Sequence, residues 1–157
     1  MWGSTATFFQ LSGNWSAAIP LVENLSLTNT LFAGYTSGSN IPLHYHYYLG
    51  GQTRNPAFPI HQHPFMGYSA QQLRSTNLFG IRTELQFRFT NNTYIKGGWN
   101  AAHLSDSWSF DLSPDRMKYG YALSLGANTI IGPMELSLST PNFSNDYALK
   151  IDIGYHF

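Results

Sequence analysis

The stretch LFGIRTELQFRFT, residues 78–90, decides the fold class because apolar and polar side chains alternate along it. The odd positions from Phe79 to Phe89 are apolar except for Thr83, whereas the even positions from Arg82 to Arg88 are charged or amide side chains. A period of two is typical of a β-strand with one apolar and one polar face, and it does not fit a helix, whose period is 3.6. The sequence therefore predicts a half-buried strand here.

The same alternation recurs along most of the chain. It predicts seven further strands, at residues 5–19, 24–37, 41–49, 92–103, 118–131, 133–140 and 147–157. Short turns separate the later strands, while residues 50–77 form a long proline-rich loop. No segment shows a convincing helical period. We expect an all-β, antiparallel protein of eight strands, organised as one domain over residues 1–157.

The composition indicates which solvent the apolar face meets. Only 10% of the residues are charged, against about 25% in ordinary soluble domains, while 16% are aromatic. A soluble β-sandwich or lipocalin-like barrel is the alternative, but its outer face would need more charged residues. No run of 18 apolar residues predicts a spanning helix. These features favour a transmembrane β-barrel with lipid outside and polar groups inside.

Other partner classes find little support. The formal net charge is zero and the basic residues form no stripe, so nucleic acid is not an expected partner. The absence of cysteine excludes disulfides and thiolate metal sites. No signal peptide is evident at the N-terminus, so we expect either a removed signal or a piece of a longer chain. No cofactor is expected.

In the predicted barrel, the polar positions of the strands face the lumen. Charged side chains there are expected to pair with one another across neighbouring strands. This lumenal polar set comprises Arg82, Glu84, Arg88, Lys96, Glu135, Lys150 and Asp152. The sequence leaves open whether the lumen is an open conduit or is plugged.

The final stretch, YALKIDIGYHF at residues 147–157, alternates in the same way and ends on an aromatic residue. Its apolar side resembles the signal by which outer-membrane barrels are recognised for insertion. The residues of this expected signal are Tyr147, Leu149, Ile151, Ile153, Tyr155 and Phe157.

Several local motifs together resemble a known family. They are YYLGG at 47–51, PFMGY at 64–68, GIRTELQFR at 80–88, the Gly-Pro turn at 132–133 and GYHF at 154–157. The chain resembles the C-terminal half of a BamA-like barrel of the surface-antigen superfamily, and most of all the barrel of patatin-like phospholipase autotransporters. The resemblance implies location in the outer membrane of a Gram-negative bacterium, membrane anchoring, and polypeptide translocation or outer-membrane protein assembly. It also implies insertion by the barrel-assembly machinery.

The resemblance further implies that the long loop folds back into the lumen with Phe65, Met66, Gly67 and Tyr68 at its tip. In the family an arginine precedes the Gly-aromatic pair and meets lumenal acids, whereas this chain has Met66. Glu84 matches the acidic position of the family's wall. Its partner in this chain is left open among Arg82, Arg88 and Lys96.

Family barrels have sixteen strands, five of them after the inward loop, so the chain resembles the last eight. A homodimer or a missing N-terminal half-barrel would then complete the cylinder. The alternative is a stand-alone, closed eight-stranded barrel with a structural or adhesion role, which would be too narrow to hold the loop.

Two candidate chemistries have plainer alternatives. His44, His46, His61 and His63 are weak candidates for a metal site, with hydrogen-bonded lumen or loop histidines as the default. His103 and Ser105 have the spacing used by lipid A deacylase barrels, but no orienting carboxylate is assignable. The chain has no GxSxG nucleophile elbow. We therefore expect no enzyme here, and any phospholipase activity would reside in a separate domain.

Overall fold

The computed structural model describes residues 6–51, 61–107, 113–142 and 144–154 of the chain. Its main element is a seven-stranded sheet in the order β1-β2-β6-β7-β8-β9-β10, with every neighbouring pair antiparallel. The all-β, antiparallel class is therefore confirmed. The strands are β1 (Thr7–Val22), β2 (Leu25–Ser39), β6 (Asn77–Arg88), β7 (Thr93–Ser105), β8 (Met117–Thr129), β9 (Gly132–Pro141) and β10 (Ala148–Ile153).

A second, three-stranded sheet is formed by the segment that connects β2 to β6. Its order is β4-β3-β5, and its strands are only two or three residues long. The elements of this segment are the 3-10 turn η1 (Leu43–Tyr45), β3 (Tyr47–Leu49), β4 (Gln62–His63) and β5 (Leu73–Ser75). The other helical turn, η2 (Pro114–Arg116), precedes β8. No helix in the described part of the chain is long and apolar enough to cross a membrane.

The prediction that residues 41–49 form a strand of the wall is wrong. Residues 43–45 form η1, and β3 pairs with β4 and β5 rather than with the main sheet. The alternating apolar residues do not share one exposed face, because Leu43 is 58% exposed while Tyr47 and Leu49 are fully buried. The main sheet consequently has two strands before the loop instead of three, and the five expected strands after it are confirmed.

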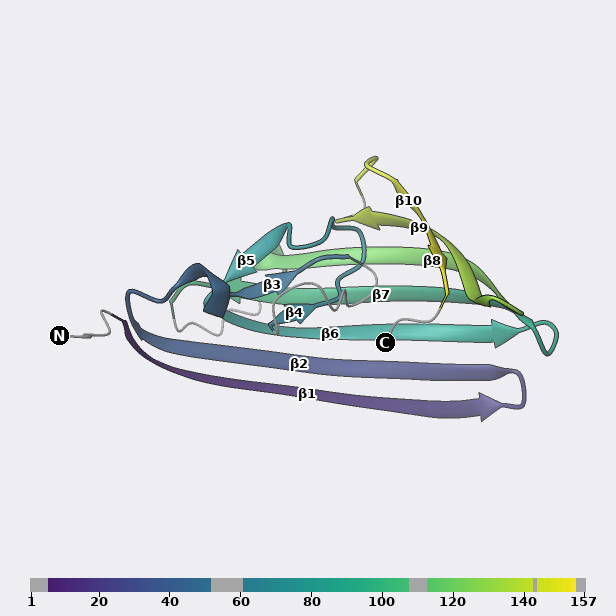
Figure 1. Ribbon diagram of the computed structural model, residues 1–157, viewed down its shortest axis with the longest axis horizontal. Coiled ribbons are helices and arrows are strands. Elements are labelled where there is room, and N and C mark those ends of the chain that lie inside the picture. Colours follow the sequence, from purple (N-terminus) through teal and green to yellow (C-terminus); the bar gives the residue numbers. More distant parts are fainter. Residues whose placement is uncertain (1–5, 52–60, 108–112, 143, 155–157) are drawn as a thin grey trace.

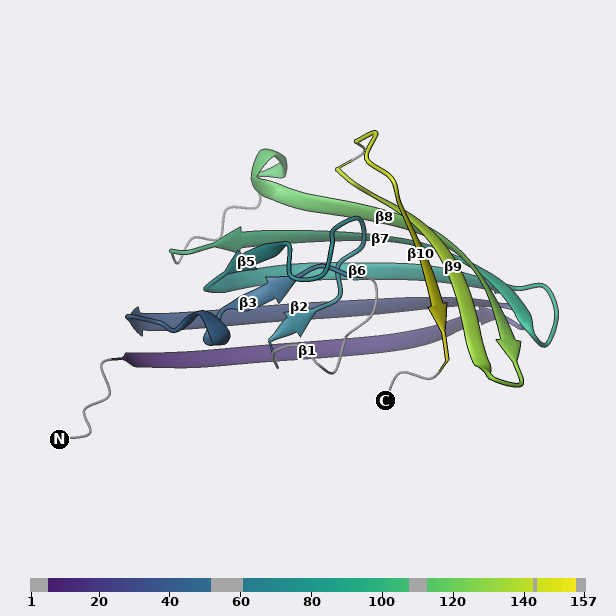
Figure 2. The same ribbon diagram turned by 45° about the horizontal axis from the view of Figure 1, so that its top comes forward.

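The main sheet is strongly curved. In Figures 1 and 2, β8, β9 and β10 turn away from the plane of β1 and β2, and the small sheet lies on the inner side of the curve. We call this inner side the concave face and the other the convex face. The short connections at Glu23–Asn24 and Ile130–Ile131 mark one end of the strands, here called the turn end. The long connections mark the opposite, loop end.

The cross-strand register separates the two faces. Leu31, Ile81 and Ala101 are paired across β2, β6 and β7 on the convex face, and their neighbours Thr30, Arg82 and Asn100 are paired on the concave face. Large apolar side chains on the convex face, such as Leu123 and Leu125, are more than half exposed. The predicted division into an apolar and a polar side therefore holds along the wall.

The buried apolar cluster lies between the connecting segment and the concave face. Tyr47, Leu49 and Phe65 come from the segment, and all three are fully buried. Phe32, Leu78 and Ala102 come from β2, β6 and β7. The packed core thus lies inside the curve, opposite the apolar convex surface, which is the arrangement expected when lipid rather than protein covers the outside.

Candidate functional site

The candidate site is formed where the segment between β2 and β6 lies against the concave face. We call residues 40–76 the inserted loop, of which 40–51 and 61–76 are described. Its predicted tip, Phe65 to Tyr68, does lie on the wall. The backbone N–H of Met66 donates to Asn100 Oδ1 over 2.7 Å, and Asn100, on β7, is fully buried.

Two glycines make this close approach feasible. Gly67 has φ +81°, a conformation that glycine adopts without strain, and a Cβ there would lie 2.4 Å from the carbonyl oxygen of Thr140 on β9. On β8, a Cβ at Gly120 would lie 1.8 Å from the carbonyl oxygen of Met66. The tip therefore contacts three adjacent strands, β7 to β9, with backbone against backbone.

The beginning of the inserted loop is bound to the other side of the wall. The Tyr47 hydroxyl donates to the carbonyl oxygen of Leu11 on β1 over 2.9 Å. Gln10 Nε2 donates to the Tyr45 carbonyl oxygen over 2.7 Å. Burial raises the pKa of Tyr47 above its usual range, so this hydroxyl stays protonated as a donor. The loop therefore spans the concave face from β1 to β9.

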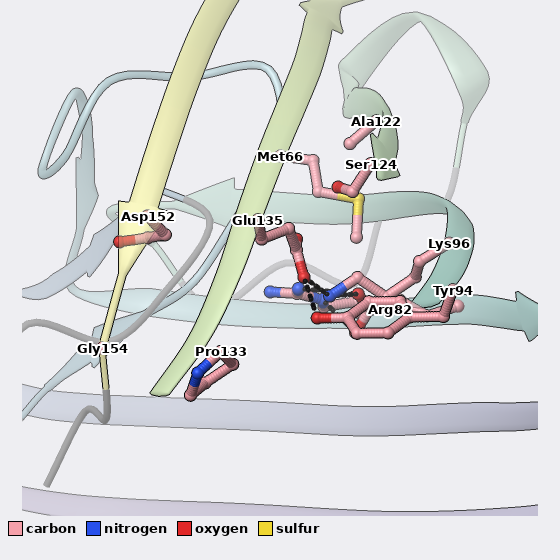
Figure 3. Close-up of a pocket in the computed structure, with 11 residues that line it drawn as sticks. Met66, Arg82, Tyr94, Lys96, Ala122, Ser124, Pro133, Glu135, Asp152 and Gly154 are labelled. Carbon is pink, nitrogen blue, oxygen red and sulfur yellow. Dashed lines mark hydrogen bonds and ion pairs between the residues drawn. The ribbon is translucent and has the colours of Figure 1, made fainter. Parts of the chain in front are cut away.

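Toward the turn end from the tip, charged side chains form a connected network. The guanidinium of Arg82 donates twice to the carboxylate of Glu84, over 2.9 and 3.0 Å. Lys96 Nζ lies 3.7 Å from Glu84 Oε1 and 2.8 Å from Glu135 Oε2, so it links β6 to β9. The Tyr94 hydroxyl adds a hydrogen bond of 3.1 Å to Glu135. In Figure 3 the side chains of Arg82, Tyr94, Lys96 and Glu135 converge, and Met66 lies beside them.

The network separates two hollows of the concave face. One, of about 140 Å³, is lined by residues of β6 to β10 and by Met66. The other, of about 260 Å³, is lined by Asn14, Ser16 and Thr30 and by His63 of the loop. Arg82 and Glu84 line both. Both hollows are therefore lined by side chains of opposite charge.

The structure also shows which basic side chain pairs with Glu84. Arg82, two residues away on the same strand, pairs with it in a bidentate manner, and Lys96 lies beside it. A guanidinium thus meets the wall carboxylate although the loop position is Met66, because the arginine comes from the wall itself. The Met66 side chain lies over Gly98, where a Cβ would be 2.6 Å from Met66 Cε.

Of the remaining members of the predicted lumenal set, Asp152 lines the same hollow as the network. Arg88 is exposed at the turn end of β6 and donates to the Glu23 carbonyl oxygen over 3.3 Å. Lys150 pairs with Asp152 on β10. In Figure 3 Asp152 stands apart from the Arg82, Lys96 and Glu135 group. Four of the seven residues, Arg82, Glu84, Lys96 and Glu135, are therefore brought together.

The predicted C-terminal signal lies partly on β10. Leu149, Ile151 and Ile153 are 56% to 68% exposed and alternate with Lys150 and Asp152, and Tyr147 just before the strand is 64% exposed. Tyr155 and Phe157 lie outside the described residues.

The histidines of the loop lie among aromatic rings. His63 stacks on Phe32 with ring centres 5.0 Å apart, and His61 meets the edge of Tyr47 at 5.5 Å. His44 lies 4.3 Å from the Tyr45 ring. Within the described ranges no three histidine, aspartate or glutamate residues gather in a way that could hold a metal ion. His44, His61 and His63 therefore have aromatic rings as neighbours, while His46 Nδ1 is buried without a hydrogen-bond partner.

His103 and Ser105 do not form a nucleophile–base pair. Both imidazole nitrogens of His103 are buried without a hydrogen-bond partner. The Ser105 hydroxyl donates instead to the carbonyl oxygen of Ser107 over 2.5 Å. A serine nucleophile needs its base within hydrogen-bond reach, and this geometry does not supply it.

Sequence reasoning did not assign the wall residues that receive the loop. Asn100 lies within the expected strand at residues 92–103, but neither it nor Gly98 nor Gly120 was singled out. A glycine inside a strand often marks a close approach of another backbone, so the glycines of β7 and β8 carried a usable signal. The signal could not have identified the loop as the partner.

The chain was compared with curated proteins and with models of protein families. The search among curated proteins found no match. The family model of the OMP85 superfamily matches residues 3–157, almost the whole chain, and this superfamily consists of outer-membrane β-barrel proteins. The chain therefore belongs to the OMP85 superfamily.

Proposed function

We propose that the chain forms part of the membrane-embedded wall of an outer-membrane barrel and anchors its polypeptide there. The observation that carries the proposal is the polarity of the sheet: large apolar side chains are exposed on the convex face, whereas the concave face is covered by the inserted loop and the ion network. Lipid is the partner of the convex face. The barrel-assembly machinery is the proposed partner during insertion, through the outward residues of β10.

A charge placed on the convex face tests this proposal. Leu123, in the middle of β8, and Leu43, in η1 of the inserted loop, are 56% and 58% exposed. Their similar exposure makes Leu123→Lys and Leu43→Lys a matched pair. A lysine near the middle of a lipid-facing strand costs about 2–4 kcal/mol. Leu123→Lys should therefore reduce stable insertion strongly, while Leu43→Lys should leave it nearly unchanged.

The measurement is flotation with liposomes of outer-membrane lipids, followed by extraction with alkaline carbonate. The unaltered chain and Leu43→Lys should float and resist extraction. Equal behaviour of the two lysine variants would contradict a lipid-facing role for the convex face.

A second proposed role is polypeptide translocation or outer-membrane protein assembly, as in the family branch that the sequence resembles. The inserted loop supports it, because the loop covers the lumen through a few polar contacts such as Met66 to Asn100 and Tyr47 to Leu11. Any phospholipase would lie in a separate domain, with this chain as its anchor and without catalysis of its own. Planar-bilayer conductance tests the plug: Asn100→Ala should increase open events, and an unchanged current would argue against gating by the loop.

A further inference from the structure

The connection between β8 and β9 consists of two exposed isoleucines. Ile130 is completely exposed and Ile131 is 69% exposed. At the same end of the sheet, the connection of β1 to β2 consists of Glu23 and Asn24. Turns in water favour polar residues and glycine, and the transfer of an isoleucine side chain from water to an apolar phase is favoured about tenfold or more. The β8–β9 turn therefore fits apolar surroundings better than water.

A groove on the convex face begins next to this turn. Its volume is about 410 Å³, and it lies across β7 to β10. Ala127 pairs with Met134 on its floor, and the next two residue pairs toward the turn end lead to the two isoleucines. The side chains of this groove are those of Thr93, Leu125, Ala127, Met134, Leu136 and Ile151. We call it the convex groove.

The depth of the convex groove follows from side-chain size. Ala127 contributes a single methyl group, whereas the larger Leu125, Leu136 and Ile151 stand around it and are 44% to 64% exposed. The groove is therefore a hollow with an alanine floor and aliphatic walls, and its volume lies in the range of about 300–1,000 Å³ that small-molecule sites have.

The polar groups near the convex groove are occupied elsewhere. Glu135 and Gly126 complete its lining, but the Glu135 carboxylate belongs to the concave network, where it binds Lys96. The Thr93 hydroxyl is hydrogen-bonded to the hydroxyl of Thr90 over 2.9 Å. Within the described residues, the convex groove thus offers a ligand apolar contacts and no charged side chain.

The convex groove is continuous with the apolar surface toward the loop end. Leu123 and Leu138, the outward pair that follows Leu125 and Leu136, are 56% and 44% exposed. A long hydrocarbon chain seated over Ala127 would remain in contact with this surface along its length. In outer-membrane barrels the short turns lie on the periplasmic side, so the hydrocarbon available at the turn end belongs to the periplasmic leaflet.

We propose that the convex groove binds one acyl chain of a glycerophospholipid of the periplasmic leaflet, and that the β8–β9 turn lies in this leaflet beside it. The proposal rests on the lipid-facing role proposed above and adds a discrete site to it. Recognition by apolar contacts predicts selection for a long acyl chain and equal binding of ethanolamine and glycerol head groups.

Retained lipid provides the first test. The chain is refolded into liposomes of dipalmitoyl phosphatidylethanolamine and phosphatidylglycerol, extracted with a mild detergent and analysed by native mass spectrometry. The unaltered chain should retain one phospholipid. Ala127→Phe, which occupies the floor, should lose it. Ala17→Phe should retain it, because Ala17 is also a partly buried alanine but lies on β1, outside the groove. Retention in Ala127→Phe, loss in both variants or no lipid on the unaltered chain would overturn the proposal.

Competition on the unaltered chain keeps the test independent of any variant. Dipalmitoyl phospholipids with either head group should displace the retained lipid equally, and dioctanoyl phosphatidylglycerol should displace it poorly. Equal displacement by the dioctanoyl lipid, or displacement by lipid A in preference to phospholipid, would contradict a site for a long phospholipid chain.

The position of the turn is tested with fluorescent labels on single cysteines, since the chain has none of its own. Phospholipids with a nitroxide on the acyl chain should quench a label at Ile130→Cys and spare one at Asn24→Cys, while a water-soluble quencher should do the opposite. Equal quenching at the two sites would place the β8–β9 turn outside the leaflet. Flotation of the same preparations tests membrane insertion separately, so failure of the proposed function is recognised on its own.

Discussion

The wall and the inserted loop use the same kinds of apolar residue in opposite ways. Phe89, at the turn end of the wall, is 54% exposed, whereas Phe65, at the loop tip, is fully buried. The wall leaves its apolar side chains exposed on the convex face, which we propose to be covered by lipid, while the loop buries its own against the concave face. Because one region is exposed and the other is buried, the two should respond differently to the same substitution.

The largest difference is expected for phenylalanine truncation. Phe65→Ala removes a fully buried ring from the cluster between loop and wall, and such substitutions cost about 3–5 kcal/mol. Phe89→Ala leaves no internal cavity, so its effect should remain within about 1 kcal/mol. Urea unfolding in detergent, followed by tryptophan fluorescence, measures both. Equal losses would mean that the loop cluster is no better packed than the convex surface.

Replacing a glycine of the wall by alanine should have the next largest effect, and the effect should differ between the concave and the convex face. At Gly120 an added Cβ would lie 1.8 Å from the Met66 carbonyl oxygen, and a backbone group cannot easily yield. Overpacking of this kind costs about 1–3 kcal/mol, so Gly120→Ala should displace the loop tip and increase its cleavage by protease. Gly97→Ala is the control, because nothing lies within 4 Å of the place that its Cβ would occupy. A tip that stays protected in Gly120→Ala would show that the loop is not held against β8.

A similar contrast exists between two asparagines. Asn100 accepts the Met66 N–H on the concave face, whereas Asn29 accepts the Thr83 hydroxyl within the wall, each over 2.7 Å. Asn100→Ala leaves a buried N–H without its acceptor, which costs about 1–3 kcal/mol. Hydrogen exchange at Met66 should therefore accelerate in Asn100→Ala and remain unchanged in Asn29→Ala. Acceleration in both variants would point to general loosening of the sheet.

The wall was largely predictable from the sequence, because alternation reports directly which residues share one face of a strand. The strand at residues 78–90 and the four after it were identified from this signal alone, and the OMP85 match supports the wider family that the motifs had indicated. Alternation failed at residues 41–49. There the same pattern serves a short turn and a buried three-residue strand, and contacts with β1, β4 and β5 distinguish these from a wall strand.

The site was predictable in part. The charged residues of the strands could be placed on the concave face, but their pairing depends on register, which brings Lys96 close to Glu135 two strands away. The seat of the loop could not be derived, because it is built from backbone groups and from the absence of side chains at Gly98 and Gly120. Such contacts leave little trace in a pattern of apolar and polar residues.

The smallest expected effect concerns pH and again distinguishes packed from exposed parts of the loop. Burial lowers the pKa of His61 below its ordinary value of 6.5, since desolvation disfavours the imidazolium form. The released loop then binds more protons than the docked loop, so docking is complete above about pH 6.5 and weakens as the pH falls below that value. The protection factor of the β4 amides against hydrogen exchange should therefore fall on acidification, and His61→Gln should reduce this dependence. His44→Gln, which replaces an exposed histidine of η1, should leave it intact. If the two variants respond alike, protonation of His61 is not what loosens the loop.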